Sequence, residues 1–381
     1  MENKITFNKP HITGFELGYI EEVIRSRKLS GNAYFTKKCQ NYFEVKYGFK
    51  KCLLTTSCTD ALEMAAILAN IEPGDEVIMP SYTFVSTANA FVLRGAKIVF
   101  CDSKKKYPTI DENLIESLIT SKTKAIVPVH YAGVSCDMEK IMSLSRKYNL
   151  FVIEDAAQAI DSYYIDSSEN KIPLGSIGHF STFSFHETKN IVCGEGGMLV
   201  INDTKYIKRA EVIWEKGTNR SAFFRGEVNK YGWIDIGSSY LPSELLAAFL
   251  WAQLEQLEKI QNRRIEIWNL YYAKLKNWAS KSNLKLPFIP AFATNNAHMF
   301  YLICESLEQR TQIIEILKAN NIQAVFHYLS LEESSFGKKY FTQTNFNSNN
   351  FTETLLRLPL YYDLNDNDIQ YITEKLMCFE K

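Results

Sequence analysis

Residues 52–62, which read CLLTTSCTDAL, contain the transition that decides the fold. The apolar residues 52–54 are typical of a short buried strand, and the amphipathic stretch 61–68 is typical of a helix. The small polar residues between them predict a tight turn that opens this helix. A strand followed directly by a helix is the repeating unit of an α/β fold.

The same alternation continues along the chain. Apolar runs follow at 76–79, 98–100, 125–129 and 151–153, each after a segment with helical periodicity. Strands that are apolar on both faces and separated by helices are typical of a parallel sheet with helices on each side. We therefore predict an α/β protein with a large, mostly parallel sheet.

The pattern changes after the sheet region. Pro242-Ser243-Glu244 predicts a helix start, and apolar residues continue at helical spacing towards residue 275. We predict a large domain over 1–242, a bridging helix over 243–275 and a small C-terminal domain over 276–381. The segment 342–352 is rich in Asn, Thr and Ser, which predicts an exposed loop.

The composition excludes several classes of protein. Among 381 residues, 43 are basic and 43 acidic, and this balance argues against a nucleic-acid or anionic-membrane binding protein. There is no apolar run of about 18 residues and no apolar stretch at the polar N-terminus, so we expect a cytoplasmic protein. The eight cysteines form no CxxC pair and the six histidines do not cluster, so we predict no metal site.

Three segments carry candidate chemistry. Ser57, Cys58 and Thr59 open a helix after a strand, where N–H groups and the helix dipole favour a phosphate. The alternative is a simple N-cap, which occurs at most helix starts. Asp155 follows the strand 151–153, at the sheet edge where α/β proteins bind ligands, or else it caps the next helix. Lys189 precedes a glycine-rich turn and is a candidate Schiff-base lysine, or a solvated charge. Their order along the chain is that of an aminotransferase dependent on pyridoxal 5′-phosphate (PLP).

Longer segments support this interpretation. They are 28–31, 80–90 (PSYTFVSTANA), 129–133, 185–190 (FHETKN), 215–221 (EKGTNRS) and 235–241. Over nearly the whole chain the sequence resembles the DegT/DnrJ/EryC1/StrS sugar aminotransferases. The blocks at 185–190 and 215–221 resemble the members that make dTDP-4-amino-4,6-dideoxygalactose. The resemblance implies PLP-dependent transferase fold type I, as in aspartate aminotransferase, with a small α+β C-terminal domain.

The resemblance also implies a set of cofactor contacts. Lys189 would hold PLP as a Schiff base, and Asp155 would keep its pyridine nitrogen protonated. Gln158 would reach the phenolic oxygen, and Phe84 would stack on the ring, although a core aromatic is the alternative for Phe84. The residues expected at the phosphate are Ser57, Cys58, Thr59 and Ser184, with Ser238 or Ser239 contributed by a second subunit.

The implied reaction has two substrates that share one site. L-Glutamate would give its amino group to dTDP-4-dehydro-6-deoxy-D-glucose, which yields dTDP-4-amino-4,6-dideoxy-D-galactose and 2-oxoglutarate. Relatives are homodimers with shared active sites, and such amino sugars enter O-antigen, other lipopolysaccharide and enterobacterial common antigen. Residues 220–240 would reach into the partner's site. The expected substrate-binding residues are Ser30, Gly31, Tyr34, Arg220, Arg225 and Lys230, with packing as the alternative for Tyr34 and a solvated loop as that for the cations.

Two departures and three alternatives accompany this expectation. Leu241 stands where many relatives have an Asn, and Glu332 stands where many have a His, four residues after a Tyr. The alternative product is the C4 epimer, dTDP-4-amino-4,6-dideoxyglucose. A dehydratase on this scaffold carries His in place of Lys189, so the lysine argues against it. A PLP-binding regulator would add a basic DNA-binding module, and the neutral charge argues against that.

Overall fold

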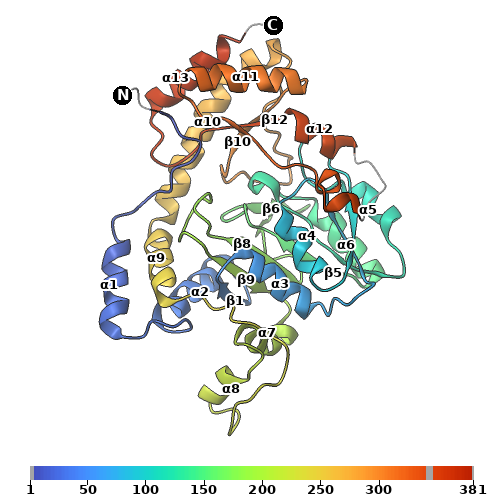
Figure 1. Cartoon of the computed structure of the whole chain (residues 1–381), viewed down its shortest axis with the longest axis vertical. Helices are drawn as coiled ribbons and strands as arrows, with labels where there is room; N and C mark the ends of the chain where they lie inside the picture. The colour runs from blue at the N-terminus through green and yellow to red at the C-terminus, as the bar shows by residue number, and fades with distance from the viewer. Residues whose placement is uncertain (1–3, 340–345, 380–381) are drawn as a thin grey trace.

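The computed structural model describes residues 4–339 and 346–379 (Figure 1). Its main sheet has seven strands in the order β1-β9-β8-β5-β4-β2-β3. β9 is antiparallel to both neighbours, and the other adjacent pairs are parallel. The strands are β1 Lys51–Thr55, β2 Glu76–Pro80, β3 Lys97–Cys101, β4 Thr123–Ile126, β5 Phe151–Asp155, β8 Phe180–Ser184 and β9 Gly197–Ile201. The α/β class and the mostly parallel sheet are confirmed.

Helices cover both faces of this sheet. Successive side chains of each strand point to opposite faces, and apolar side chains on both faces are buried under helices. Leu54 and Ile78 pack in one core, whereas Leu53 and Val77 pack in the other. The surrounding helices are α1 Glu16–Ser26, α2 Tyr34–Tyr47, α3 Cys58–Leu68, α4 Val85–Val92, α5 Glu112–Leu118, α6 Met138–Tyr148 and α7 Ile207–Trp214. Two small elements flank them, the hairpin of β6 Tyr163–Ile165 with β7 Lys171–Pro173, and α8 Arg220–Phe224.

A second sheet lies above the first in Figure 1 and has its own core. It has the order β10-β12-β11 and packs against helices of the C-terminal region. Its elements are β10 Phe300–Ile303, α11 Leu307–Ala319, β11 Val325–Phe326, α12 Phe346–Thr354, β12 Leu355–Leu358 and α13 Asp366–Met377. Ile5 near the N-terminus pairs with Ile322 and packs in this core. The predicted division at residues 242 and 275 stays a prediction.

Two long helices connect the sheets. The predicted helix start is confirmed, because Ser243 caps α9 Glu244–Glu255 by accepting a hydrogen bond from the N–H of Leu246 at 3.4 Å. The helix breaks at Gln256, and α10 Leu257–Lys281 continues the path. Among the described helices, none is long and apolar enough to cross a membrane.

The prediction of an exposed loop over 342–352 is wrong for residues 346–352, while 342–345 lie outside the described residues. Residues 346–354 form α12, and Ser348 and Phe351 are buried. The cause is a distant residue. Asp102 accepts hydrogen bonds from the N–H groups of Asn347 and Ser348 at 3.0 and 2.9 Å. Capping by Asp102 therefore gives this polar segment a helical structure.

Candidate active site

A cavity of about 530 Å³ opens at the carboxyl ends of β5 and β8, between the two sheets. Its size is typical of a small-molecule site. The fold brings eight of the sequence-predicted residues to its walls, namely Ser57, Cys58, Thr59, Phe84, Asp155, Gln158, Ser184 and Lys189. These residues come from strand ends, helix starts and turns spread over more than a hundred positions of the chain, so their convergence depends on the tertiary fold.

The first turn of α3 forms one end of the cavity. Ser57 caps the helix by accepting a hydrogen bond from the N–H of Asp60 at 3.1 Å. Helix geometry leaves the N–H groups of Cys58 and Thr59 without an intrahelical acceptor. A Cβ atom on Gly197 of β9 would lie 2.4 Å from the Cys58 nitrogen, so only glycine lets this turn lie against the strand. The turn therefore suits an anion such as a phosphate.

Asp155 ends β5 and faces the cavity. Its carboxylate accepts hydrogen bonds from the Thr87 hydroxyl at 2.7 Å and from the Ala157 N–H at 3.1 Å. Burial raises the pKa of Asp155, while these two hydrogen bonds and the nearby Lys189 oppose that rise. A cation held against Asp155 would stabilise its charged form. Sequence reasoning missed Thr87, whose only signal was its place in the matching segment 80–90.

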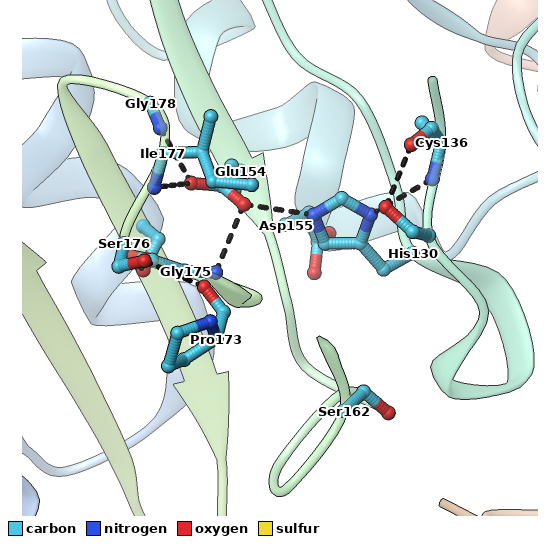
Figure 2. Close-up of polar contacts among 12 residues, drawn as sticks. His130, Cys136, Glu154, Asp155, Ser162, Pro173, Gly175, Ser176, Ile177 and Gly178 are labelled. Carbon is cyan, nitrogen blue, oxygen red and sulfur yellow. Dashed lines mark hydrogen bonds and ion pairs between the residues drawn. The ribbon is translucent and has the colours of Figure 1, made fainter. Parts of the chain in front are cut away.

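The adjacent carboxylate, Glu154, has a structural role (Figure 2). It is fully buried and accepts three hydrogen bonds of 2.6 to 2.9 Å from backbone N–H groups in the turn 175–178. The Glu154 carboxylate also lies 3.0 Å from Nε2 of His130, and Nδ1 of His130 accepts a hydrogen bond from the N–H of Cys136. The backbone N–H of His130 donates to the carbonyl of Asp155 at 3.0 Å. This network holds the end of β5 and so positions Asp155.

Lys189 lies in the turn between β8 and β9. Its side chain is only partly exposed, and its backbone N–H donates to the carbonyl of His186 at 2.9 Å. Burial lowers the pKa of the Lys189 amine, and the nearby Cys58 and Asp155 act in the opposite direction. An amine that loses its proton readily can serve as a nucleophile and as a base.

Two predicted residues form the side walls. The Gln158 carboxamide accepts from the Ala132 N–H at 2.6 Å and donates to the Tyr328 hydroxyl at 3.1 Å. Phe84 is 54% exposed, so it is not a core aromatic, and its ring centroid lies 6.1 Å from that of Tyr328. Both side chains therefore face the open space of the cavity.

Sequence reasoning missed most of the wall residues that come from the N-terminal and C-terminal parts of the chain. The additional lining residues with polar or aromatic side chains include Phe7, Asn8, His298, His327, Tyr328 and Arg357. His327 is buried, and its Nδ1 lies 2.6 Å from the Tyr131 hydroxyl. Tyr328 is the exception among them, because it begins the segment that ends in Glu332 and that resembles a motif of many relatives. No local pattern marks the other residues, because each is isolated in sequence from the cofactor motifs. Glu332, which stands where many relatives have a His, is buried and does not line the cavity.

The predicted substrate-binding residues lie elsewhere in the chain. Ser30, Gly31 and Arg220 line a second hollow beside Leu241. Ser239, which was expected at the PLP phosphate, lines the same hollow and not the Lys189 cavity. Arg225 lines a third hollow and forms ion pairs with Glu211 and Glu227 at 2.8 and 2.7 Å, so its charge is already balanced. Tyr34 and Lys230 are exposed and line none of these hollows. Within one chain, this group is separate from the Lys189 cavity.

Comparisons with known proteins show the family of this chain. The sequence profile of the DegT/DnrJ/EryC1/StrS aminotransferase family matches residues 10–377. The spore coat polysaccharide biosynthesis protein SpsC of Bacillus subtilis is 32% identical over 97% of this chain and 95% of its own length. GDP-perosamine synthase of Caulobacter vibrioides is 31% identical over 85% of each chain.

Solved structures share the fold. The aminotransferase TlmJ of Streptoalloteichus hindustanus superposes with a TM-score of 0.89 at 26% identity, over 99% of this chain and 98% of that one. Spr1654 of Streptococcus pneumoniae, classed as a sugar aminotransferase, superposes in its PLP form with a TM-score of 0.88. It is 25% identical over 99% of this chain and 98% of its own.

PLP is the cofactor of this chain, and the observed cavity fits it. The first turn of α3 offers N–H groups to a phosphate, and Gly197 keeps that turn free of a Cβ contact. Asp155 offers a buried carboxylate to a ring nitrogen, and Lys189 offers an amine to a carbonyl. The phosphate, the protonated ring nitrogen and the carbonyl group of PLP would therefore each have a complementary group in one cavity.

Proposed function

The chain belongs to the DegT/DnrJ/EryC1/StrS aminotransferase family and is a PLP-dependent sugar aminotransferase, and we propose that it transfers the amino group of L-glutamate to dTDP-4-dehydro-6-deoxy-D-glucose. The product would be dTDP-4-amino-4,6-dideoxy-D-galactose. The observation that carries this proposal is the single cavity that joins Lys189, Asp155 and the first turn of α3. The segments 185–190 and 215–221 support the choice of sugar through their resemblance to the subgroup that makes it.

Each cofactor residue has a proposed role. Lys189 would bind the PLP carbonyl carbon through Nζ, and Asp155 would hold the ring nitrogen in its protonated form. The remaining contacts fall to Ser57, Cys58, Thr59 and Ser184 for the phosphate, Gln158 for the phenolic oxygen and Phe84 for the ring face. When bound, PLP supplies the carbonyl that takes up the amino group and the ring that stabilises negative charge on the reacting carbon.

Lys189 would also move the proton. Burial lowers the pKa of its amine, which increases the fraction of the neutral base near neutral pH. Nζ would take a proton from the α-carbon of the donor in the first half of the reaction. In the second half, Nζ would deliver a proton to the bound keto sugar's former carbonyl carbon, C4. The walls formed by Phe84 and Tyr328 would limit access of water to this proton.

We place the nucleotide sugar between two subunits. Arg220, Ser239, Ser30 and Gly31 line one hollow of the chain but not the Lys189 cavity. The segment around them carries exposed apolar side chains, and Trp233 is 83% exposed. An exposed apolar segment of this kind is typical of a contact surface. A homodimer in which this segment completes the partner's site would join the two groups of residues.

The biological setting follows from the relatives' names. One relative is a polysaccharide biosynthesis protein and another is a synthase for a GDP-linked amino sugar. We propose that this chain supplies an amino sugar for a bacterial surface polysaccharide, such as an O-antigen, lipopolysaccharide or enterobacterial common antigen.

The test is product analysis. Purified protein is incubated with PLP, L-glutamate and dTDP-4-dehydro-6-deoxy-D-glucose, and the H3–H4 coupling of the amino sugar is read by NMR. A small coupling means an axial amino group and the galacto product, as proposed. A large coupling means the gluco epimer and contradicts the proposed product. Release of 2-oxoglutarate without any amino sugar contradicts the keto sugar, and a GDP-linked 4-keto sugar is then tried in its place.

A further inference from the structure

Arg357 is a cavity residue that the roles above leave unassigned. It belongs to β12, the central strand of the three-stranded sheet. Its neighbours Leu356 and Leu358 pack in the core of that sheet, so Arg357 points from the opposite face, where it lines the cavity. β12 and α3 lie in opposite halves of the molecule, and both contribute walls to this cavity (Figure 1).

The guanidinium of Arg357 has no anionic partner in the described chain. Within residues 4–339 and 346–379 it forms no ion pair. Its Nη2 donates to the carbonyl of Phe326 at 3.1 Å, and the group lies 4.6 Å from the ring centroid of Phe7. Its Nε is buried and has no hydrogen-bond partner. Arg225 differs, since two carboxylates balance its charge.

This arrangement is unfavourable in the free protein. Burial lowers the pKa of Arg357, and only neighbouring tyrosines act in the opposite direction. Arg357 is partly buried, and a cation of this kind with an unused donor gains from an anionic ligand that accepts its hydrogen bonds. The planar guanidinium matches the two oxygens of a carboxylate in particular.

The chemistry of the two substrates identifies the anion. In an α-amino acid the carboxylate is bonded directly to the carbon that exchanges its proton with Lys189. In a nucleotide sugar the diphosphate is on C1, across the hexose ring from the reacting C4. Arg357 and Lys189 line the same cavity and interact electrostatically. A cation at this place is therefore matched to the amino donor, while the PLP phosphate is assigned to the first turn of α3.

We propose that Arg357 binds the α-carboxylate of the amino donor. The N–H groups at the edge of the guanidinium plane would form paired hydrogen bonds with the carboxylate, while Phe7 packs against one face of that plane. This inference rests on the proposed function, because it requires the cavity to accept an amino acid. It assigns Arg357 as a substrate-binding residue that selects donors with a carboxylate beside the amine.

The experiment separates the two halves of the reaction. Arg357→Gln and Arg357→Lys are loaded with PLP, and the change in visible absorbance is followed as L-glutamate is added. We expect the apparent Kd for L-glutamate to rise about 10- to 100-fold in Arg357→Gln, the value of a hydrogen bond to a charged group. The apparent Kd for 2-oxoglutarate with the pyridoxamine form should rise by a similar factor. Arg357→Lys should show a smaller rise, because a lysine keeps the charge but loses the paired geometry.

Two controls exclude a structural effect. Arg310→Gln removes another arginine of the C-terminal region, which stacks on Phe326 outside the cavity, and should leave the Kd for L-glutamate unchanged. 1-Aminopropane carries no carboxylate, so its reaction with the PLP form should be equal in wild type and in Arg357→Gln. If Arg357→Gln does not fold, Arg357→Lys alone is compared with wild type on both amines.

The outcomes distinguish this inference from the proposed function. An unchanged Kd for L-glutamate in the Arg357 variants overturns the inference, and so does an equal loss with 1-aminopropane. A loss confined to the pyridoxamine form with the keto sugar also overturns it, because it assigns Arg357 to the sugar. If wild type reacts with L-glutamate but forms no amino sugar, the proposed keto sugar fails, while the Arg357 measurement remains valid.

Discussion

Neighbouring residues of the same type have different roles in this site. Glu154 and Asp155 are both buried at the end of β5, but the strand directs their side chains to opposite sides. Glu154 receives three backbone N–H groups and His130, which satisfies it completely. Asp155 receives two donors and keeps a raised pKa. The residue with the less satisfied charge is the one that faces the cofactor cavity.

At the residue scale we predict the pH dependence of PLP capture by the cofactor-free protein. The neutral amine of Lys189 reacts, so the rate should rise with pH and level off once the amine is deprotonated. Because burial lowers its pKa, the midpoint should lie below the 10.5 of an ordinary lysine. Stopped-flow absorbance between about pH 6 and 10 measures this midpoint.

A variant tests the sign of the effect. The Asp155 carboxylate raises the pKa of Lys189, so Asp155→Asn should move the midpoint to lower pH. Asp166→Asn, on an exposed turn outside the cavity, should leave it unchanged. A midpoint at the value of free lysine, or a rise in Asp155→Asn, would show that Lys189 is solvated.

At the scale of elements, the capping residue of a helix comes either from the adjacent sequence or from a distant element. Ser243 before α9 was identifiable from its own neighbours, because an N-cap acts within one turn. α12 was not, because its cap is Asp102, which lies about 245 positions earlier in the chain. Local pattern therefore predicts a helix whose cap is local and misses one whose cap comes from another element.

We predict that the cap of α3 has a second effect that an ordinary cap lacks. Ser57→Ala and Ser306→Ala each remove a cap hydrogen bond, of 3.1 and 3.2 Å, from α3 and α11. Each should lower the free energy of unfolding by about 1 kcal/mol. Only Ser57→Ala should also weaken the binding of PLP, since Ser57 lines the cavity and Ser306 does not.

The measurement combines chemical denaturation without PLP and PLP titration by absorbance. An equal loss of PLP affinity in both variants would indicate a general loss of stability. Unchanged PLP affinity in Ser57→Ala would mean that the phosphate does not use this turn.

At the scale of the whole molecule, the fold assembles one group of predicted residues and leaves the other group apart. Figure 1 shows α8 and the loop after it projecting below α7, on the side of the large sheet away from the three-stranded sheet. Arg220 begins α8 and lines the second hollow, and no described acidic residue forms an ion pair with it. A projecting segment with an exposed aromatic side chain and an unbalanced cation favours contact with a second copy of the chain.

We predict complementation between two inactive variants. Lys189→Ala removes the base, and Arg220→Gln removes the cation that we assign to the partner's site, so each homodimer should be nearly inactive. Mixing and reassociating the two should restore about one quarter of wild-type activity, because half of the dimers then contain one intact site of two. Product formation after refolding of the mixture measures this. Recovery absent from the mixture, with both variants folded and dimeric, would place Arg220 and Lys189 in the same site of one chain.

By itself, the sequence determined the class of fold, the cofactor motifs and their order along the chain. Each depends on contacts within a strand, a turn or a few neighbouring residues, and local physics suffices to recognise a strand end, an N-cap or a glycine turn. The tertiary structure alone decided how these motifs meet. Thr87 reaches Asp155, Asp102 caps α12 and Arg357 enters the cavity only because distant segments pack together. Such contacts depend on how elements pack across the two cores, and no local pattern records that packing.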